Sequence, residues 1–390
     1  MKKRILRYFK HIALTILIPL PFVMIFGLYH GASLHYGDNP LALQWDNEGP
    51  YIFFSNDSTV SVNYIKGNPD DGFYASNKVY HTDSLSSVTC YYPLDSTQFQ
   101  IPIKTSFETP KSIYQDTGKI LAISDIESNY KAFRDFLITS NVINQKLEWI
   151  FGNGHLVLVG DFVDRGYFTT QVLWFIYKLE MDAEKEGGFV HFIIGNHELK
   201  MMYGDYLATS PKYYHVASIL GKKQVELYDQ KSLIGKWMAS KNAMEIINGN
   251  LFVHGGIHPD LANSTLSLEE INQLIRNNYH HSFSPRSTKT SEQFIISAIT
   301  GPCWYRGYFR EDLTQQQVQA GLDKFNAKAV IVGHTLQSKV KKAYAGKVFG
   351  IDVKHPSDDR TDFPFGESEG LLIEGDTYYR VVDTGIKYKL

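Results

Sequence analysis

Five short apolar runs, each followed by a residue that can bind a metal ion, constrain this 390-residue chain more than any other feature. The runs are KILAIS, HLVLVG, VHFIIG, NLFV and AVIVG, and the residues after them are Asp125, Asp161, Asn196, His254 and His334. Such runs are typical of buried strands, and a Gly or Ser directly after a strand permits a sharp turn. If the strands lie side by side, their ends meet and the five side chains form one site.

The chemistry of these five residues favours a metal centre. Asp, Asn and His are oxygen and nitrogen ligands of hard and borderline divalent ions. Two such ions, about 3.5–4 Å apart, can clamp a phosphoryl group in line with an attacking hydroxide. Each residue alone would more often be a capping or hydrogen-bonding residue, so the prediction depends on all five occurring together.

The strings around these residues resemble a known superfamily. In order they are SDIESN, GDFVDRG, GNHE, VHGG and GHT, and this succession resembles the calcineurin-like metallophosphoesterases, which include the Ser/Thr phosphoprotein phosphatases. The strings YGDYLATSPKYY, LIGKWM, GPCWYRGYF and GKVFGID are similar to the bacterial Shewanella-like phosphatase branch. The resemblance runs from about Lys119 to the C-terminus. It implies an α/β (α+β) fold with a central two-sheet β-sandwich flanked by helices, and hydrolysis of phosphomonoesters by a hydroxide that bridges two metal ions.

The resemblance also implies a role for each motif residue. Asp161 matches the carboxylate that bridges both ions, since its two oxygens can reach two cations. Asn196, His254 and His334 match the other ligands of the second ion. Asp125 matches a ligand of the first ion.

Four further residues are predicted to act on the substrate. His197 matches an imidazolium that donates a proton to the leaving-group oxygen, and Asp164 would orient it and raise its pKa. Arg165 and Arg306 are predicted phosphate clamps, because a guanidinium offers a planar fork of donors to two phosphate oxygens. Arg306 follows two aromatic residues, so stacking on them is the alternative. Glu198, the last residue of GNHE, is expected to be structural.

One position departs from the family pattern. Where the family has Asp-x-His, this chain has Asp125-Ile126-Glu127, and Ser128 replaces the usual Gly. In an extended segment, residues two apart face the same side, so Glu127 is expected to remain a ligand. A first site of Asp125, Glu127 and Asp161 favours Mn²⁺ or Mg²⁺, with Zn²⁺ and iron as alternatives. If Glu127 does not bind, the first site is weak and the protein is slow or inactive. The alternative function is then that of a protein on a degenerate phosphatase scaffold, which binds phosphorylated ligands or assembles an envelope complex. Within the enzyme class, phosphodiester cleavage is the alternative reaction.

The N-terminus predicts a membrane segment. MKKRILRYFKH carries five Lys or Arg residues, and residues 12–29 then form an uncharged run. At 1.5 Å per residue this run spans about 27 Å, close to the thickness of a bilayer core. The basic flank predicts a single-pass inner-membrane anchor with the catalytic domain on the exported side. A cleaved signal peptide, giving a secreted or periplasmic protein, is the alternative. Pro19 and Pro21 leave a bent or re-entrant segment open.

Three segments are therefore expected: residues 1–36 as anchor or signal, residues 37–112 as a small β-rich domain, and residues 113–390 as the catalytic domain. Short alternating runs such as TVSVNYI predict the β-rich domain, which is a spacer or a substrate- or partner-binding module. Cys90 and Cys303 are expected to be buried thiols rather than a disulfide. A net charge of −2 gives no overall attraction to nucleic acid. The resemblance implies a phosphorylated small molecule or a phosphoprotein as the partner.

Overall fold

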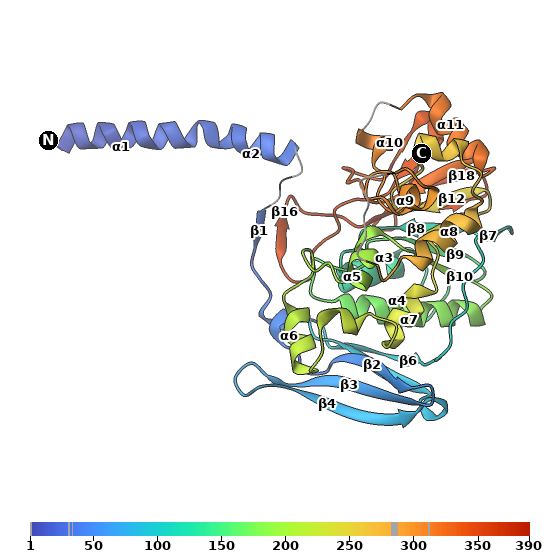
Figure 1. Ribbon diagram of the computed structural model, residues 1–390. Coiled ribbons are helices and arrows are strands. Elements are labelled where there is room, and N and C mark those ends of the chain that lie inside the picture. Colours follow the sequence, from blue (N-terminus) through green and yellow to red (C-terminus); the bar gives the residue numbers. More distant parts are fainter. Residues whose placement is uncertain (1, 30–31, 33, 282–287, 311–312) are drawn as a thin grey trace.

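The computed structural model describes residues 2–29, 32, 34–281, 288–310 and 313–390. Two mixed sheets form its centre (Figure 1). The first has the order β10 (Phe189–Ile193), β9 (His155–Val159), β8 (Ile120–Ile123), β17 (Glu369–Glu374), β18 (Thr377–Val382), β19 (Lys387–Lys389). The second has the order β14 (Lys341–Ala343), β15 (Val348–Gly350), β13 (Ala329–Val332), β12 (Asn250–Val253), β11 (Met244–Ile247), β7 (Ile113–Tyr114). The predicted α/β class with two central sheets is confirmed.

The predicted ligands follow the ends of parallel strands. In the first sheet β8, β9 and β10 are parallel neighbours, and in the second sheet β12, β13 and β15 are. Alternate side chains of these strands fill the space between the sheets, among them Ala122, Val157 and Ile331. The intervening Leu121 and Leu156 belong to the apolar cluster that includes the helices. This alternation follows from the two-residue period of a strand.

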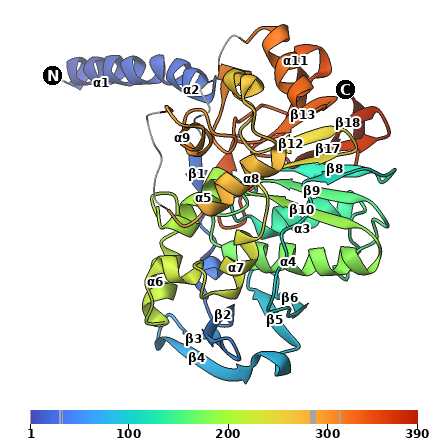
Figure 2. The ribbon, with the colours of Figure 1, turned by 45° about the vertical axis from the view of Figure 1, so that its right-hand side comes forward.

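Helices cover the sheets on their outer faces, with α3 and α4 against the first sheet and α8 against β11 (Figure 2). The α-helices after residue 29 in the described part of the chain are α3 (Tyr130–Thr139), α4 (Thr169–Lys185), α5 (Asn196–Tyr203), α6 (Lys212–Ile219), α7 (Leu233–Ala239), α8 (Leu268–Asn277), α9 (Ser291–Ile296), α10 (Gly307–Arg310), α11 (Gln315–Lys324). Cys90 and Cys303 are both buried and free, as expected for core thiols.

The segment before the central sheets is rich in strands. Its members are β2 (Glu48–Asn56), β3 (Thr59–Asn68), β4 (Gly72–His81), β5 (Ser87–Tyr92), β6 (Thr97–Pro102). The first three form an antiparallel sheet and the last two a hairpin. Their buried side chains join the same apolar cluster as α4. For example, Phe99 lies 5.4 Å from Phe175, ring centre to ring centre, and the indole N–H of Trp174 donates to the carbonyl oxygen of Pro50 at 2.8 Å. The boundary of an independent domain at residue 112 stays a prediction.

The N-terminal segment projects from the rest of the molecule (Figure 1). It consists of α1 (Lys2–Leu17) and α2 (Pro19–Tyr29), and none of their side chains is buried. The two helices meet at Ile18, directly before Pro19, where the missing N–H of proline ends the regular bonding pattern. By length and composition, Lys2–Tyr29 is able to cross a membrane. Whether it does so stays a prediction.

Candidate metal centre

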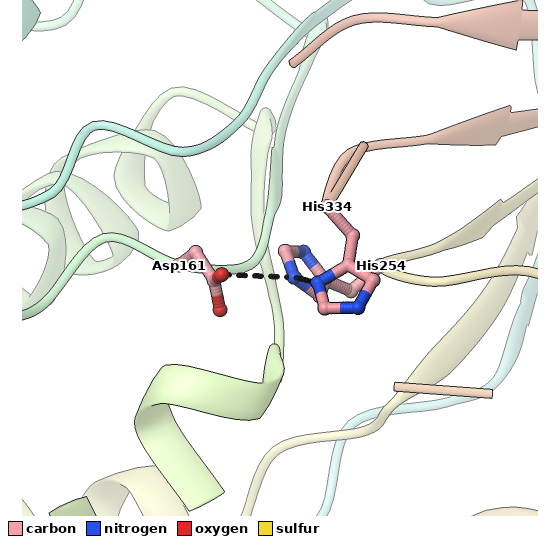
Figure 3. Close-up of side chains that lie close together, drawn as sticks. All are labelled: Asp161, His254 and His334. Carbon is pink, nitrogen blue, oxygen red and sulfur yellow. Dashed lines mark hydrogen bonds and ion pairs between the residues drawn. The ribbon is translucent and has the colours of Figure 1, made fainter. Parts of the chain in front are cut away.

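The ends of the parallel strands carry the five predicted ligands. Asp125 follows β8, Asp161 follows β9, Asn196 begins α5 after β10, His254 follows β12 and His334 follows β13. All five side chains are buried. The structure brings donor atoms of Asp161, His254 and His334 within 4.8 Å of one another, and Figure 3 shows these side chains facing a common point.

The two histidines are held in defined tautomers. The Nδ1 atom of His254 lies 2.7 Å from the carbonyl oxygen of Val159, and Nε2 of His334 lies 2.9 Å from that of Trp304. A carbonyl oxygen only accepts hydrogen bonds, so each of these ring nitrogens carries the proton. In the neutral rings the opposite nitrogens therefore hold lone pairs. Main-chain acceptors that orient a histidine in this way are a recurrent feature of metal ligands.

Four electron-pair donors converge where those lone pairs point. The Nε2 atom of His254 lies 3.1 Å from Nδ1 of His334, 3.1 Å from Oδ2 of Asp161 and 3.1 Å from Oδ1 of Asn196. Burial lowers the pKa of His254, but the Asp161 carboxylate outweighs burial and raises it to about 9. Burial and the neighbouring His254 hold the pKa of His334 well below its ordinary value. The carboxylate thus favours a positive charge on one ring but not on both, and the nitrogen and oxygen donors together fit a divalent ion.

Glu198 holds the loops that carry these ligands. Its Oε2 accepts hydrogen bonds from the main-chain N–H groups of Asp161 at 2.9 Å and Gly195 at 2.8 Å. Its Oε1 accepts from the N–H of Phe162 at 2.8 Å. One buried carboxylate therefore ties the turn after β9 to the start of α5, which is the structural role expected for it.

The first predicted site is less compact. Asp125 Oδ2 accepts a hydrogen bond from the main-chain N–H of His334 at 3.1 Å. Within the described residues, neither Asp125 nor Glu127 joins a group of three donors as close as that around His254. The expectation of an extended segment is wrong, because Asp125 has φ 54° and Glu127 has φ 51°. Glu127 instead turns its Oε1 toward Arg165, with which it forms an ion pair.

Asp352 is a site residue that the sequence reasoning missed. It follows β15, its side chain is 6% exposed, and it lines the same cavity as Asp125 and Glu127. In the part of the chain that the structure describes, its carboxylate makes no recorded hydrogen bond. Burial and the nearby carboxylates of Glu127 and Asp161 raise its pKa well above the ordinary value. The sequence does contain a signal for Asp352, because the apolar run VFGI before it repeats the pattern of a strand followed by a possible ligand.

His197 and Asp164 form the expected pair. His197 Nδ1 lies 2.9 Å from Oδ2 of Asp164, whose Oδ1 accepts a hydrogen bond from the hydroxyl of Thr209 at 2.8 Å. The opposite nitrogen, Nε2, lies 3.8 Å from Oδ2 of Asp161 and 3.5 Å from the Arg165 guanidinium. Burial lowers the pKa of His197, but the carboxylates of Asp161 and Asp164 outweigh it and raise the pKa.

Beside these residues lies a cavity of about 410 Å³. Both predicted clamps, Arg165 and Arg306, line it, and Arg306 also donates to the main-chain oxygen of His334. Three further cations line the cavity that the sequence did not single out: Arg310, Lys354 and Arg360. The five cations share the cavity lining with five carboxylates. Guanidinium and ammonium groups beside buried carboxylates suit an anionic substrate held next to metal ions.

Comparison with known proteins agrees with this geometry. Shewanella-like protein phosphatase 1 of Plasmodium berghei (strain Anka) is 29% identical over 231 residues, which are 56% of this chain and 62% of that protein. Shewanella-like protein phosphatase 2 of Arabidopsis thaliana is 23% identical over 351 residues, which are 77% of this chain and 84% of that protein. The match to the Plasmodium protein thus spans less than two thirds of its length.

A solved structure extends the comparison to three dimensions. The crystal structure of a cold-active protein-tyrosine phosphatase from a psychrophilic Shewanella species aligns with a TM-score of 0.76 at 28% identity, covering 88% of this chain and 99% of that one. The family model of the calcineurin-like phosphoesterases matches residues 118–338, which carry the strings from SDIESN to GHT. The chain therefore belongs to the calcineurin-like phosphoesterase family and resembles the Shewanella-like phosphatases within it.

Proposed function

We propose that this protein is a membrane-anchored phosphomonoesterase that depends on two divalent metal ions. The observation that carries the proposal is the convergence of lone pairs from His254 and His334 with the oxygens of Asp161 and Asn196 at one buried point. Two ring nitrogens oriented by main-chain carbonyl groups, facing each other at 3.1 Å beside a carboxylate, suit a divalent cation between them.

Each ion has a proposed set of ligands. Asp161, Asn196, His254 and His334 hold the second ion. Asp125, Glu127 and Asp161 hold the first, for which Glu127 retains its Oε2 while Oε1 binds Arg165. Bound divalent ions supply Lewis-acid stabilisation of the phosphoryl oxygens and an activated water. Because the first set contains only carboxylates, Mn²⁺ or Mg²⁺ is favoured there.

The side chains around the ions perform the remaining steps. Arg165 and Arg306 bind non-bridging phosphate oxygens from the cavity wall. His197, whose pKa is raised against burial by the carboxylates of Asp161 and Asp164, donates a proton from Nε2 to the leaving-group oxygen. This proton transfer serves any phosphate ester, and a phosphomonoester is the substrate class that we propose. The Shewanella relative, whose structure bears the name protein-tyrosine phosphatase, supports this class of substrate.

The test is metal analysis and hydrolysis of an aryl phosphate by the detergent-solubilised full chain with Mn²⁺, Mg²⁺ or Zn²⁺. We expect two ions per chain and turnover that Asp161→Asn lowers at least about 100-fold, since it removes charge shared by both ions. Asp376→Asn, in the exposed turn after β17, is the control and should leave turnover unchanged. Full activity of Asp161→Asn with both metals retained contradicts the assignment. Two bound metals without turnover in the wild type would favour the phosphate-binding alternative.

A further inference from the structure

A two-stranded ribbon connects the anchor segment to the wall of the catalytic cavity. β1 (Leu34–Tyr36) pairs antiparallel with β16 (Thr361–Phe363), so that Leu34 lies opposite Phe363 and His35 opposite Asp362. His35 and Asp362 form an ion pair, and both line the cavity that holds Asp125 and Arg165. The ribbon thus forms part of the cavity wall, although its strands lie near the two ends of the chain.

The other face of this ribbon is apolar and exposed. Because side chains alternate along a strand, Leu34, Tyr36 and Phe363 point away from the His35 face. Leu34 is 58% exposed and Tyr36 is 55% exposed. Phe365, which is 72% exposed, lies beside Phe363 with 6.0 Å between the ring centres. Contiguous exposed apolar side chains of this size are typical of a surface that contacts a membrane or a protein.

A basic cleft of about 1030 Å³ continues the catalytic cavity toward the anchor. The end of α2 lines it through Leu28 and Tyr29, and the opposite wall carries cationic side chains. The four residues that line both the cleft and the catalytic cavity are Arg310, Leu336, Val353 and Lys354. The other cations of the cleft are Lys339, Lys341 and Arg380, of which Arg380 is paired with Glu369. Glu367 is the second acidic residue of the lining, so cations outnumber carboxylates. A continuous basic path therefore leads from the end of the apolar helix to the metal centre.

The length of the chain limits how far this surface can lie from a bilayer. Leu34 follows Tyr29 by five residues, which reach at most about 18 Å when fully extended. Figure 1 shows β1 and β16 on the side of the catalytic domain from which α1 and α2 project. Apolar side chains flanked by Lys and Arg suit the interface of an anionic membrane, where the rings enter the headgroup layer and the cations face lipid phosphates.

We propose that the β1–β16 ribbon seats the catalytic domain on the membrane surface, and that the substrate is a phosphomonoester carried on a lipid. This inference rests on the proposed phosphatase function and anchor. In the reaction, water forms the new bond to phosphorus, the P–O bond to the lipid breaks, and the lipid oxygen takes the proton. The lipid alcohol stays in the bilayer and inorganic phosphate leaves through the cavity mouth.

The test uses the full chain in vesicles of neutral lipid with phosphatidic acid as the lipid phosphomonoester, and glycerol 3-phosphate as the soluble counterpart. We expect phosphatidic acid to be hydrolysed with the higher kcat/KM. Leu34→Ser/Phe363→Ser should lower hydrolysis of phosphatidic acid about tenfold, because less apolar surface enters the membrane, and leave glycerol 3-phosphate turnover unchanged. Lys339→Glu/Lys341→Glu, which leaves the ribbon intact, should have the same selective effect.

Tyr74→Ser/Val79→Ser on β4 is the matched control. Both residues are exposed, at 62% and 61%, and both ribbon views place β4 at the far end of the molecule from α2. This control should leave both activities unchanged. Equal effects of the ribbon variant on the two substrates, or better hydrolysis of a soluble phosphotyrosine peptide than of phosphatidic acid, would overturn the inference. If the wild type hydrolyses none of these substrates, the proposed phosphatase function itself is refuted.

Discussion

At the scale of single residues, the loops around the candidate metal centre adopt backbone conformations that are rare for L-residues. Seven residues of the site loops have φ between 51° and 67°: Asp125, Glu127, Ser128, Asp161, Asp164, Arg165 and His334. Each such conformation costs about 1–3 kcal/mol and persists only where surrounding contacts impose it. Glu198, which binds three main-chain N–H groups around Asp161, is one such contact. The directions of the side chains at the centre therefore depend on these loops.

Glu127 is expected to link the first metal site to the phosphate clamp. Glu127→Gln should lower occupancy of the first ion and raise KM for a phosphomonoester, because a neutral amide is a weaker ligand and a weaker partner for Arg165. Glu127→His should shift the metal preference toward Zn²⁺ or iron without abolishing turnover. Metal content by mass spectrometry and steady-state kinetics measure both effects. Unchanged occupancy in both variants would remove Glu127 from the ligand set.

His197 is expected to act as the general acid. His197→Ala should reduce hydrolysis of alkyl phosphates more than that of aryl phosphates with good leaving groups, because only an alkoxide needs the proton. We expect a difference of about 100-fold between the two classes, and a weaker form of the same pattern for Asp164→Asn. Rates over a series of leaving groups give the comparison. Parallel losses across the whole series would argue for a positioning role instead.

At the scale of secondary-structure elements, a buried ion pair and a hydrogen bond connect β2 to α6 and α4. Lys212 at the start of α6 donates to Oε2 of Glu48 at 2.8 Å, and Gln171 of α4 donates to the same oxygen at 2.9 Å. Burial raises the pKa of Glu48, but the charge of Lys212 outweighs it and lowers the pKa. Since the folded pKa lies below the unfolded one, this stabilisation is present above about pH 4.5 and is lost as the pH falls further.

Breaking this pair should destabilise the fold strongly. Lys212→Met leaves a buried carboxylate without its partner, and we expect the free energy of unfolding at pH 7 to fall by about 3–5 kcal/mol. Lys104→Met removes an exposed pair with Glu184 and should cost no more than about 1 kcal/mol. Urea unfolding followed by tryptophan fluorescence compares the two variants. If both variants lose a similar amount of unfolding free energy, the packing of β2 against the helices does not depend on the buried ion pair.

At the scale of the whole molecule, the predicted anchor would set the side of the membrane on which the proposed phosphatase acts. The five basic residues before residue 12 favour a cytoplasmic N-terminus, so the catalytic domain should face the exported side. A reporter fused after Leu390 should then be active only in the exported compartment, with the protein in the membrane fraction. A soluble cytoplasmic protein would refute the anchor, and a soluble exported one would indicate a cleaved signal peptide.

The sequence by itself determined the family and the five strand-end residues, because a buried strand followed by a small residue and a ligand is a local pattern. The parallel order of β8, β9 and β10 then brings such residues together. The tertiary structure decided that Glu127 turns to Arg165 and that β1 lies beside β16. These contacts join distant segments through left-handed turns and the packing of two sheets, which no local pattern of residues records.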